Sequence, residues 1–326
     1  MDAHEALRRV IIGAYLLRRL LAYIPVLIGI SIGVFGLMRL IPGDAVDIMV
    51  GQIRIDPEAR ESLRRLFGID EPIWRQYLNW IGAIFTGDLG TSIRSGRPVS
   101  EEIQSALGPT FQLAFLATIV GCIIAIPAAI ISAVRQYSLA DAVVTLFSYI
   151  GISMPVFWLG TLLILFFSVN VSWLPAGGYV SLLDDPVESI RVAILPALTL
   201  GLGFAALLMR IMRSAMLEVL RQDYVRLARA KGLREQTVFI RHVTQNVLIP
   251  VLTVIGLQFG WLLGGSVIVE QVFVRPGIGR LLVSAIFSRD YPVVQGVALL
   301  FAVIFLTTNL LVDLTYSFVD PRIRYN

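Results

Sequence analysis

The sequence has few of the residues that carry catalysis or bind metals. It contains one cysteine, Cys122, and two histidines, His4 and His242. A single cysteine forms no disulfide within the chain and no cysteine metal site, and two distant histidines do not make a zinc motif. The sequence also lacks a Gly-x-Ser-x-Gly nucleophile elbow and a Gly-Lys-Ser/Thr phosphate loop. It therefore predicts a chain that is not an enzyme and that binds no metal or cofactor of its own.

Charged residues are also scarce. They make up 15% of the chain, whereas hydrophobic residues make up 56% and the mean hydropathy is +0.78. Over 326 residues this composition indicates an integral membrane protein rather than a soluble domain. The net charge of +4 comes almost wholly from arginine, with Lys231 as the only lysine. No basic groove with interleaved aromatic residues accompanies it, so we expect this charge to set membrane topology and predict no nucleic-acid partner.

Six apolar runs are long enough to cross a hydrocarbon core of about 30 Å as helices. They lie at residues 20–41, 109–134, 141–169, 192–212, 247–269 and 293–316. The sequence therefore predicts an all-α polytopic membrane protein with six transmembrane helices. We divide it into an N-terminal extension (1–17), the first helix with a polar external region (18–108), a five-helix core (109–317) that contains a loop at 214–245, and a tail (318–326).

Basic residues are distributed unevenly between the segments that join these spans. With the N-terminus placed inside, the short outer loops hold only Arg191, Arg275, Arg280 and Arg289. The inner segments hold Arg8, Arg9, Arg18, Arg19, Arg135, Arg210, Arg213, Arg221, Arg226, Arg229, Lys231, Arg234, Arg241, Arg322 and Arg324. Because basic residues collect on the cytoplasmic side of a membrane, both termini and the loop at 214–245 are predicted to be cytoplasmic.

Two of the spans carry residues that predict special packing. The third run exceeds the hydrocarbon thickness at about 1.5 Å per residue, and Pro155 within it is where we expect a bend. A hinge that opens a pathway and a fixed kink are both compatible with this proline. In the fifth run Gly256, Gly260 and Gly264 recur at every fourth position, which is typical of helix packing seams. We favour packing within the chain over a subunit interface.

The polar region between the first and second spans has amphipathic pieces. Asp56-Pro57-Glu58 has the pattern of a helix start. Further on, Ile73, Tyr77, Trp80 and Ile84 fall on one helical face. Tryptophan and tyrosine favour the bilayer boundary, so this stretch is predicted to lie near it.

The stretch 223–250 is a polar island among the apolar spans of the second half. Its first part has the composition of a helix that Gly232 breaks, and Ala228 and Ala230 are small where a partner surface could approach closely. A second helix is predicted after the break, with an apolar face formed by Leu233, Thr237, Ile240 and Val247. The sequence thus predicts two short helices about a glycine. A basic juxtamembrane loop that touches anionic lipid is the alternative.

Several motifs resemble one transporter family. The run Ala228-Arg229-Ala230-Lys231-Gly232, followed by His242 and Asn246, resembles the cytoplasmic loop by which permease subunits of binding-protein-dependent ABC importers hold their ATPases, the peptide branch in particular. The chain departs from the general pattern at Arg226, where an acid is usual, and at Pro250, which comes later than usual. The other matching stretches, in family order, are 68–74, 77–78, 87–90, 276–281, 289–292 and 320–325.

The resemblance implies a type I ABC importer permease of the dipeptide/oligopeptide (peptide/nickel) family, in a bacterial or archaeal cell (inner) membrane. It implies four kinds of contact: a second homologous permease subunit, two ATPase subunits that bind the ATP, an external solute-binding protein and the lipid bilayer. The transported solute would be a di- or oligopeptide, with nickel or sugars as alternatives. The residues it assigns to ATPase coupling are Asp223, Ala228, Arg229, Ala230, Lys231, Gly232, His242 and Asn246. Rival classes are a secondary transporter and an intramembrane enzyme, for which the spans offer few suitable polar groups.

Overall fold

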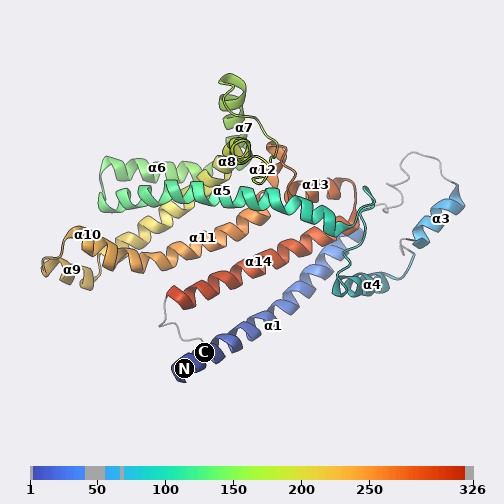
Figure 1. Ribbon diagram of the computed structural model, residues 1–326, viewed down its shortest axis with the longest axis horizontal. Coiled ribbons are helices and arrows are strands. Elements are labelled where there is room, and N and C mark those ends of the chain that lie inside the picture. Colours follow the sequence, from blue (N-terminus) through green and yellow to red (C-terminus); the bar gives the residue numbers. More distant parts are fainter. Residues whose placement is uncertain (1–2, 41–55, 67–69, 320–326) are drawn as a thin grey trace. The chain divides into compact units, whose positions relative to one another are not determined.

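The computed structural model describes residues 3–40, 56–66 and 70–319 (Figure 1). Within these ranges the regular structure is helical, apart from an isolated bridge between Thr91 and Pro98. The described residues of Met1–Gly108 and Pro276–Leu306 form one compact unit, and those of Pro109–Arg275 and Thr307–Arg324 form a second. The segment 276–306, assigned to the core from the sequence, thus groups with the first unit.

The described residues contain five helices that are long and apolar enough to cross a membrane, and a bent pair makes a sixth candidate. The five spans are Leu17–Leu40, Val99–Val134, Pro186–Leu220, Glu235–Gly264 and Tyr291–Thr315. The helices that carry them are α1 (Ala3–Leu40), α5 (Val99–Val134), α8 (Pro186–Leu220), α11 (Gln245–Gly265) and α14 (Tyr291–Val319). The prediction of an all-α membrane protein with several apolar spans is therefore confirmed.

Most of these helices extend beyond the predicted runs; α5, for example, begins at Val99 rather than at residue 109. Helix α8 continues to Leu220, and the span that includes α11 begins at Glu235. The ends of these two long segments therefore form much of the predicted loop at 214–245. Helix α1 begins at Ala3, so the predicted extension at 1–17 is helical from there and continuous with the first span. Most of the predicted tail, residues 320–326, lies outside the described residues.

The first unit contains α1, α3 (Pro57–Leu66), α4 (Ile73–Phe85), the start of α5, α13 (Ile278–Phe287) and the first part of α14. Val99 and Ile103 of α5 are buried against Ile278 of α13 and Val297 of α14. Gly296 permits this approach, because a methyl group there would lie 2.8 Å from Val99 Cγ1. A glycine thus sets how closely α14 and α5 pack in this unit.

The acid Asp290 lies between α13 and α14, where the loop before α5 supplies its hydrogen-bond donors. Its side chain is buried and accepts hydrogen bonds from Ser92 Oγ (2.5 Å), the Ile93 amide (3.2 Å) and the Arg94 amide (3.3 Å). A buried carboxylate is stable when donors surround it in this way. Asp290 therefore fixes the loop before α5 to the turn before α14, two segments nearly two hundred residues apart.

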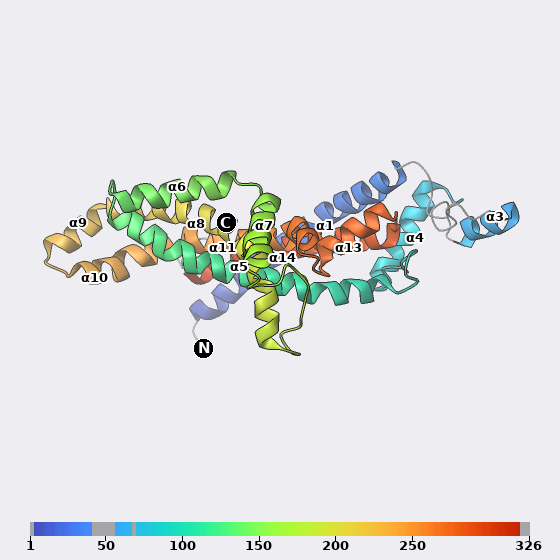
Figure 2. The ribbon, with the colours of Figure 1, turned by 90° about the horizontal axis from the view of Figure 1, so that it is seen from above.

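The second unit is built around α8. Small residues on α5, Ala125, Ala129 and Ala133, pack with Phe204 and Leu208 of α8 in a core that also includes Val247 and Val251 of α11. Small side chains let helix backbones approach closely, which supplies the packing that lipid cannot drive. Figures 1 and 2 show α5, α6 and α8 side by side in this unit.

The third span is sharply bent. Helix α6 (Leu139–Ser153) ends at Met154, and α7 (Val156–Leu163) with the π-helix η1 (Ile164–Asn170) follows at an angle of 105°. Met154 is extended, with φ −78° and ψ 124°, because a proline follows it. The predicted bend at Pro155 is therefore present. Whether it moves as a hinge stays a prediction.

The three glycines of α11 lie in different surroundings. A methyl group on Gly260 would lie 2.8 Å from Thr308 Cγ2, and one on Gly256 would overlap Val312 Cγ2, so both face α14. Gly264 is exposed, and among the described residues no atom lies within 4 Å of such a methyl group. Within the chain the predicted seam therefore involves Gly256 and Gly260 but not Gly264.

Candidate coupling site

Residues 223–244 form a compact element, which we call the knob. It comprises α9 (Asp223–Ala230), a turn, α10 (Glu235–Val238) and the π-helix η2 (Phe239–Thr244), which leads into α11. Asp223 lies in the first turn of α9, where an acid interacts favourably with the helix dipole. In Figure 1 the knob lies at the ends of α8 and α11, within the second unit.

Gly232 terminates α9 through a Schellman motif. The Gly232 amide donates to the Arg229 carbonyl (2.9 Å) and the Leu233 amide donates to the Ala228 carbonyl (3.4 Å). Gly232 has φ +76°, a left-handed conformation that glycine adopts at no steric cost. The predicted break between two short helices is thus present, and its geometry accounts for the glycine.

The knob has a small core of its own. Val225, Ala228 and Val238 are all at least nine-tenths buried, with Val219 of α8 packed against them. The expectation that Ala228 is small because a partner surface approaches it is wrong, since its side chain is only 6% exposed within this chain. Ala228 is small because α9 and α10 pack closely together. Ala230, in contrast, is exposed.

The apolar face predicted for the second helix is only partly right, because Val247 is buried as predicted whereas Leu233 and Ile240 are exposed. Leu233 is 41% and Ile240 is 68% exposed, whereas Val238 and Val243 are buried. The wider π-helical turns of η2 change the register, so that residues five apart, rather than three or four, share the buried side. A prediction that assumes 3.6 residues per turn therefore places Ile240 on the buried side and omits Val238 and Val243.

One ion pair closes the turn of the knob. Arg229 Nε and Nη2 donate to the two oxygens of Glu235, at 2.9 and 3.3 Å. Both side chains are largely exposed, so the pair contributes little stability. Its bidentate geometry instead holds the start of α10 beside the end of α9.

The remaining predicted residues lie around this frame. Lys231 is exposed at the C-cap of α9. His242 belongs to η2, and the Asn246 amide donates to the His242 carbonyl at 2.8 Å. The structure therefore brings Ala228 and Arg229 into contact with α10. It also joins His242 of η2 to Asn246 of α11.

The outside of the knob carries exposed apolar side chains. Tyr224 and Leu227 of α9 are 42% and 56% exposed. Leu233 of the turn and Ile240 of η2 are also exposed, as noted above. Apolar groups gathered on a small polar element are typical of a protein-binding surface. We call these four residues the knob contact set.

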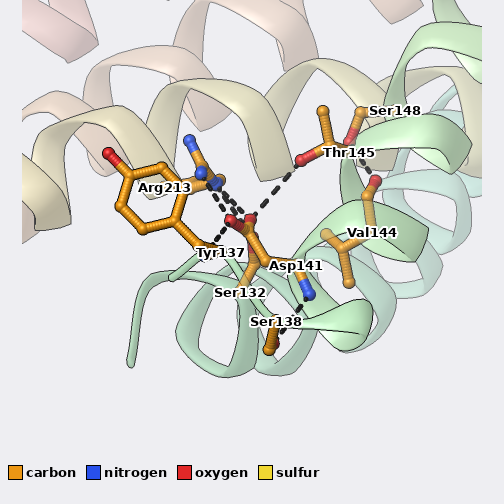
Figure 3. Close-up of polar contacts among 8 residues, drawn as sticks. All are labelled: Ser132, Tyr137, Ser138, Asp141, Val144, Thr145, Ser148 and Arg213. Atoms are coloured by element: carbon orange, nitrogen blue, oxygen red, sulfur yellow. Dashed lines mark hydrogen bonds and ion pairs between the residues drawn. The ribbon is translucent and has the colours of Figure 1, made fainter. Parts of the chain in front are cut away.

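A buried ion pair lies further along α8, as Figure 3 shows. Arg213 of α8 donates from Nε to Asp141 Oδ1 at 2.7 Å and from Nη2 to Oδ2 at 2.9 Å. The Asp141 side chain is only 7% exposed and that of Arg213 is 26% exposed. Two parallel N–H···O bonds fix the orientation of the guanidinium relative to the carboxylate and also stabilise the pair. We call it the Asp141–Arg213 joint.

The turn between α5 and α6 supplies the remaining partners of the joint. Ser132 Oγ donates to Asp141 Oδ1 (2.5 Å) and the Tyr137 amide donates to Oδ2 (2.9 Å). Tyr137 takes a left-handed φ of +67°, and the Ser138 side chain caps α6 by accepting the Asp141 amide (Figure 3). Three segments, the end of α5, the start of α6 and α8, therefore meet at one carboxylate.

Sequence reasoning missed this joint. It treated Arg213 only as a topology-setting charge and Asp141 only as the start of a span. The available signal was an acid and a base, each within an apolar helix, because such groups require partners. Since α8 continues to Leu220 and leads into α9, the joint connects the knob with the α5–α6 turn.

A second buried polar cluster lies after α12 (Val267–Val272). Arg275 is 1% exposed, donates to Gln112 Oε1 at 3.0 Å and lies over the Tyr179 ring at 5.3 Å. Burial lowers the pKa of the Arg275 guanidinium, and the charge of Glu270 opposes this change. Glu270 is itself buried and accepts from Thr110 Oγ1 at 2.7 Å. This cluster fixes the segment after α12 to the interior of the second unit.

Comparison with known proteins identifies the family. Residues 125–325 match the model of the "binding-protein-dependent transport system inner membrane component", and residues 12–114 match the model of the N-terminal part of such membrane components. The chain belongs to this family. The resemblance drawn from its motifs is thereby confirmed, and the chain is a multi-pass membrane component of a transport system.

Its relatives match over nearly their whole length. The oligopeptide transport system permease protein AppB of Bacillus subtilis is 43% identical over 96% of this chain and 100% of its own length. The dipeptide transport system permease protein DppB of Escherichia coli K12 is 42% identical over 95% of this chain and 98% of its own length.

Solved structures share the fold. A chain of the MetNI methionine ABC transporter in an inward-facing conformation aligns with a TM-score of 0.54, at 18% identity over 67% of this chain and 96% of that chain. A chain of an amino acid ABC transporter aligns with a TM-score of 0.51, at 17% identity over 66% of this chain and 93% of that chain. These alignments support the ABC importer permease fold.

Proposed function

We propose that this chain is the permease subunit of an ATP-driven importer that passes di- or oligopeptides from an external binding protein into the cytoplasm. The observation that carries the solute class is the identity of 42–43%, over nearly full length, with permeases named for oligopeptide and dipeptide transport. Nickel and sugars are the alternative solutes within the same importer class.

The knob is the proposed contact with the ATPases. Its contact set places four apolar side chains on an element predicted to face the cytoplasm. Exposed apolar side chains in water have a free-energy cost that a partner surface removes. The assembly we propose contains this chain, a second homologous permease, two ATPase subunits that hydrolyse the ATP, and the binding protein.

The Asp141–Arg213 joint is the proposed path by which movement of the knob reaches the spans. Arg213 lies on α8, which leads into the knob, while Asp141 lies on α6, which leads to the bend at Pro155. A displacement of the knob that moves α8 would therefore act on α6 through two short hydrogen bonds. Alternating access would follow from this movement as ATP binding closes the ATPases.

Two leucine-to-glutamate substitutions test the ATPase contact. Leu227→Glu places a charge in the contact set, and Leu183→Glu is the matched control, because Leu183 is 95% exposed in a loop far from the knob in the sequence. We expect Leu227→Glu to lower recovery of ATPase subunits in a detergent pull-down by about tenfold, since burying an unpaired charge costs more than about 1.4 kcal/mol. Leu183→Glu should leave recovery unchanged.

The lipid-contact alternative predicts a different pattern. If the knob only touches anionic lipid, loss of charge in an Arg226→Gln and Arg229→Gln double variant should detach the knob from the vesicle surface while the spans stay inserted. Leu227→Glu should then leave ATPase recovery at the wild-type level. Wild-type recovery in Leu227→Glu would refute the docking role. The proteins recovered with the wild-type chain from its native membrane would show whether ATPases and a second permease accompany it.

A further inference from the structure

Helix α4 of the first unit has three distinct faces. Tyr77, Trp80 and Ile84 lie on one of them, about 100° per residue along the helix. Trp74, Leu78 and Phe85 fall within about 40° of one another on a second face. Arg75 and Asn79 lie on a third. The sequence predicted only the first of these faces.

The first face packs against the span α1. Tyr77 and Ser31 share a hydrogen bond of 2.9 Å, and the Phe35 ring contacts Tyr77 edge-on at 5.4 Å and stacks on Trp80 at 5.9 Å. Figures 1 and 2 show α4 near the C-terminal end of α1. This contact lies inside an apolar span of 24 residues that ends at Leu40.

The position of the contact along α1 sets the depth of α4 in a bilayer. At about 1.5 Å per residue the span is about 36 Å long, so it extends about 3 Å beyond each edge of a hydrocarbon core of about 30 Å. Phe35 lies five residues from Leu40, about 7 Å along the helix, and is thus a few ångströms inside the hydrocarbon edge. An α4 held at this level lies at the depth typical of interfacial helices.

The second face is apolar and has no cover within the described part of the chain. Trp74, Leu78 and Phe85 are 64%, 57% and 86% exposed. Ile28 and Ile32 of α1, the apolar span against which α4 packs, are 50% and 54% exposed. Because α4 packs against a helix with the length and composition of a membrane span, lipid is the medium that meets its uncovered apolar face.

The third face is polar and exposed. Arg75 lies 4.0 Å from Glu71, with both side chains more than one-third exposed, and the Asn79 amide donates to the Glu71 carboxylate at 2.9 Å. These groups lie about 80–140° around α4 from Trp74 and Phe85, where water or lipid headgroups can solvate them.

We propose that α4 is an interfacial membrane anchor: it lies in the bilayer boundary beside the Leu40 end of α1, with Trp74, Leu78 and Phe85 among the lipid chains and Arg75 and Asn79 facing water. The partner of this surface is therefore lipid rather than protein. The anchor holds the segment that leads toward the Ser92–Asp290 contact at a fixed height above the membrane.

Spin labels on the full-length chain test this assignment. In a Cys122→Ala background, a nitroxide is attached at Leu78→Cys or Phe85→Cys, with Asn79→Cys as the matched control one position away. The chain is placed in vesicles of phosphatidylethanolamine and phosphatidylglycerol. We expect the ratio of oxygen to nickel-complex collisions to be at least about fivefold higher at positions 78 and 85 than at 79, because oxygen concentrates among lipid chains.

Two results would overturn the proposal. Equal collision ratios at positions 78 and 79 would place α4 in water. A label at position 78 that is shielded from both reagents, or that loses oxygen access when the external binding protein is added, would assign this face to a protein partner.

Discussion

Removal of either side chain of the Asp141–Arg213 joint should lower the free energy of unfolding by an amount that follows from the structure. Breaking a buried ion pair costs about 3–5 kcal/mol, because the remaining charge loses its partner. Arg213 keeps some solvent contact, and Asp141 keeps donors at Ser132 and Tyr137, so the cost here is lower. We expect about 2–3 kcal/mol for Asp141→Ala and for Arg213→Met, with a coupling energy of about 2 kcal/mol in the double-mutant cycle.

The measurement is the unfolding free energy of the full-length chain in mixed micelles, for the wild type, both single variants and the double variant. The control cycle uses Glu188 and Arg191, an ion pair of 3.4 Å on the same helix α8 whose side chains are 42% and 54% exposed. Its coupling energy should stay below about 0.5 kcal/mol.

The same variants separate a structural role from a coupling role. If the joint carries movement from the knob, the number of ATP molecules hydrolysed per solute transported should rise in each single variant. Unchanged coupling of hydrolysis to transport, measured in variants that remain folded, would show that the joint only stabilises the structure. A coupling energy no larger than that of the Glu188–Arg191 control would refute the energetic argument itself.

Three further predictions follow from single residues. Gly232→Ala should lower knob stability by about 1–2 kcal/mol, because its φ of +76° disfavours a side chain, and faster hydrogen exchange of the α9 amides should report this loss. Gly260→Leu should destabilise the packing of α11 on α14 by about 1–3 kcal/mol, as heat inactivation of solute uptake would show, whereas Gly264→Leu should have no effect because its side of the helix is open. Asp290→Ala should leave buried donors without an acceptor, so limited proteolysis should cut near Ser92; equal cleavage in the wild type would contradict this role.

Features that depend on local chemistry could be predicted from the sequence. The apolar runs locate the spans, Pro155 locates the bend, and Gly232 locates the break in the knob. Each of these follows from hydrophobic length or from the backbone limits of one residue. The pattern Gly256-x-x-x-Gly260 likewise predicts a close helix contact, although the partner helix α14 does not follow from it.

Features that depend on long-range pairing could not be predicted. Asp141 and Arg213 are 72 residues apart, and Ser92 and Asp290 are 198 apart, so no local pattern joins them. The burial of Ala228 depends on the packing of α9 against α10, which is likewise not visible in the local sequence. The exposure of Ile240 has a different cause. The π-helical turns of η2 break the 3.6-residue period on which face assignments rest.

Solute uptake into vesicles that contain the chain with its co-purified subunits is the most direct test of ATP-driven peptide import. The vesicles are loaded with ATP or with a non-hydrolysable analogue, and labelled dipeptides, oligopeptides, nickel or sugars are supplied with the binding protein. We expect peptides to accumulate with ATP and not with the analogue. Accumulation of nickel or a sugar but of no peptide, or peptide uptake driven by an ion gradient without ATP, would contradict this expectation.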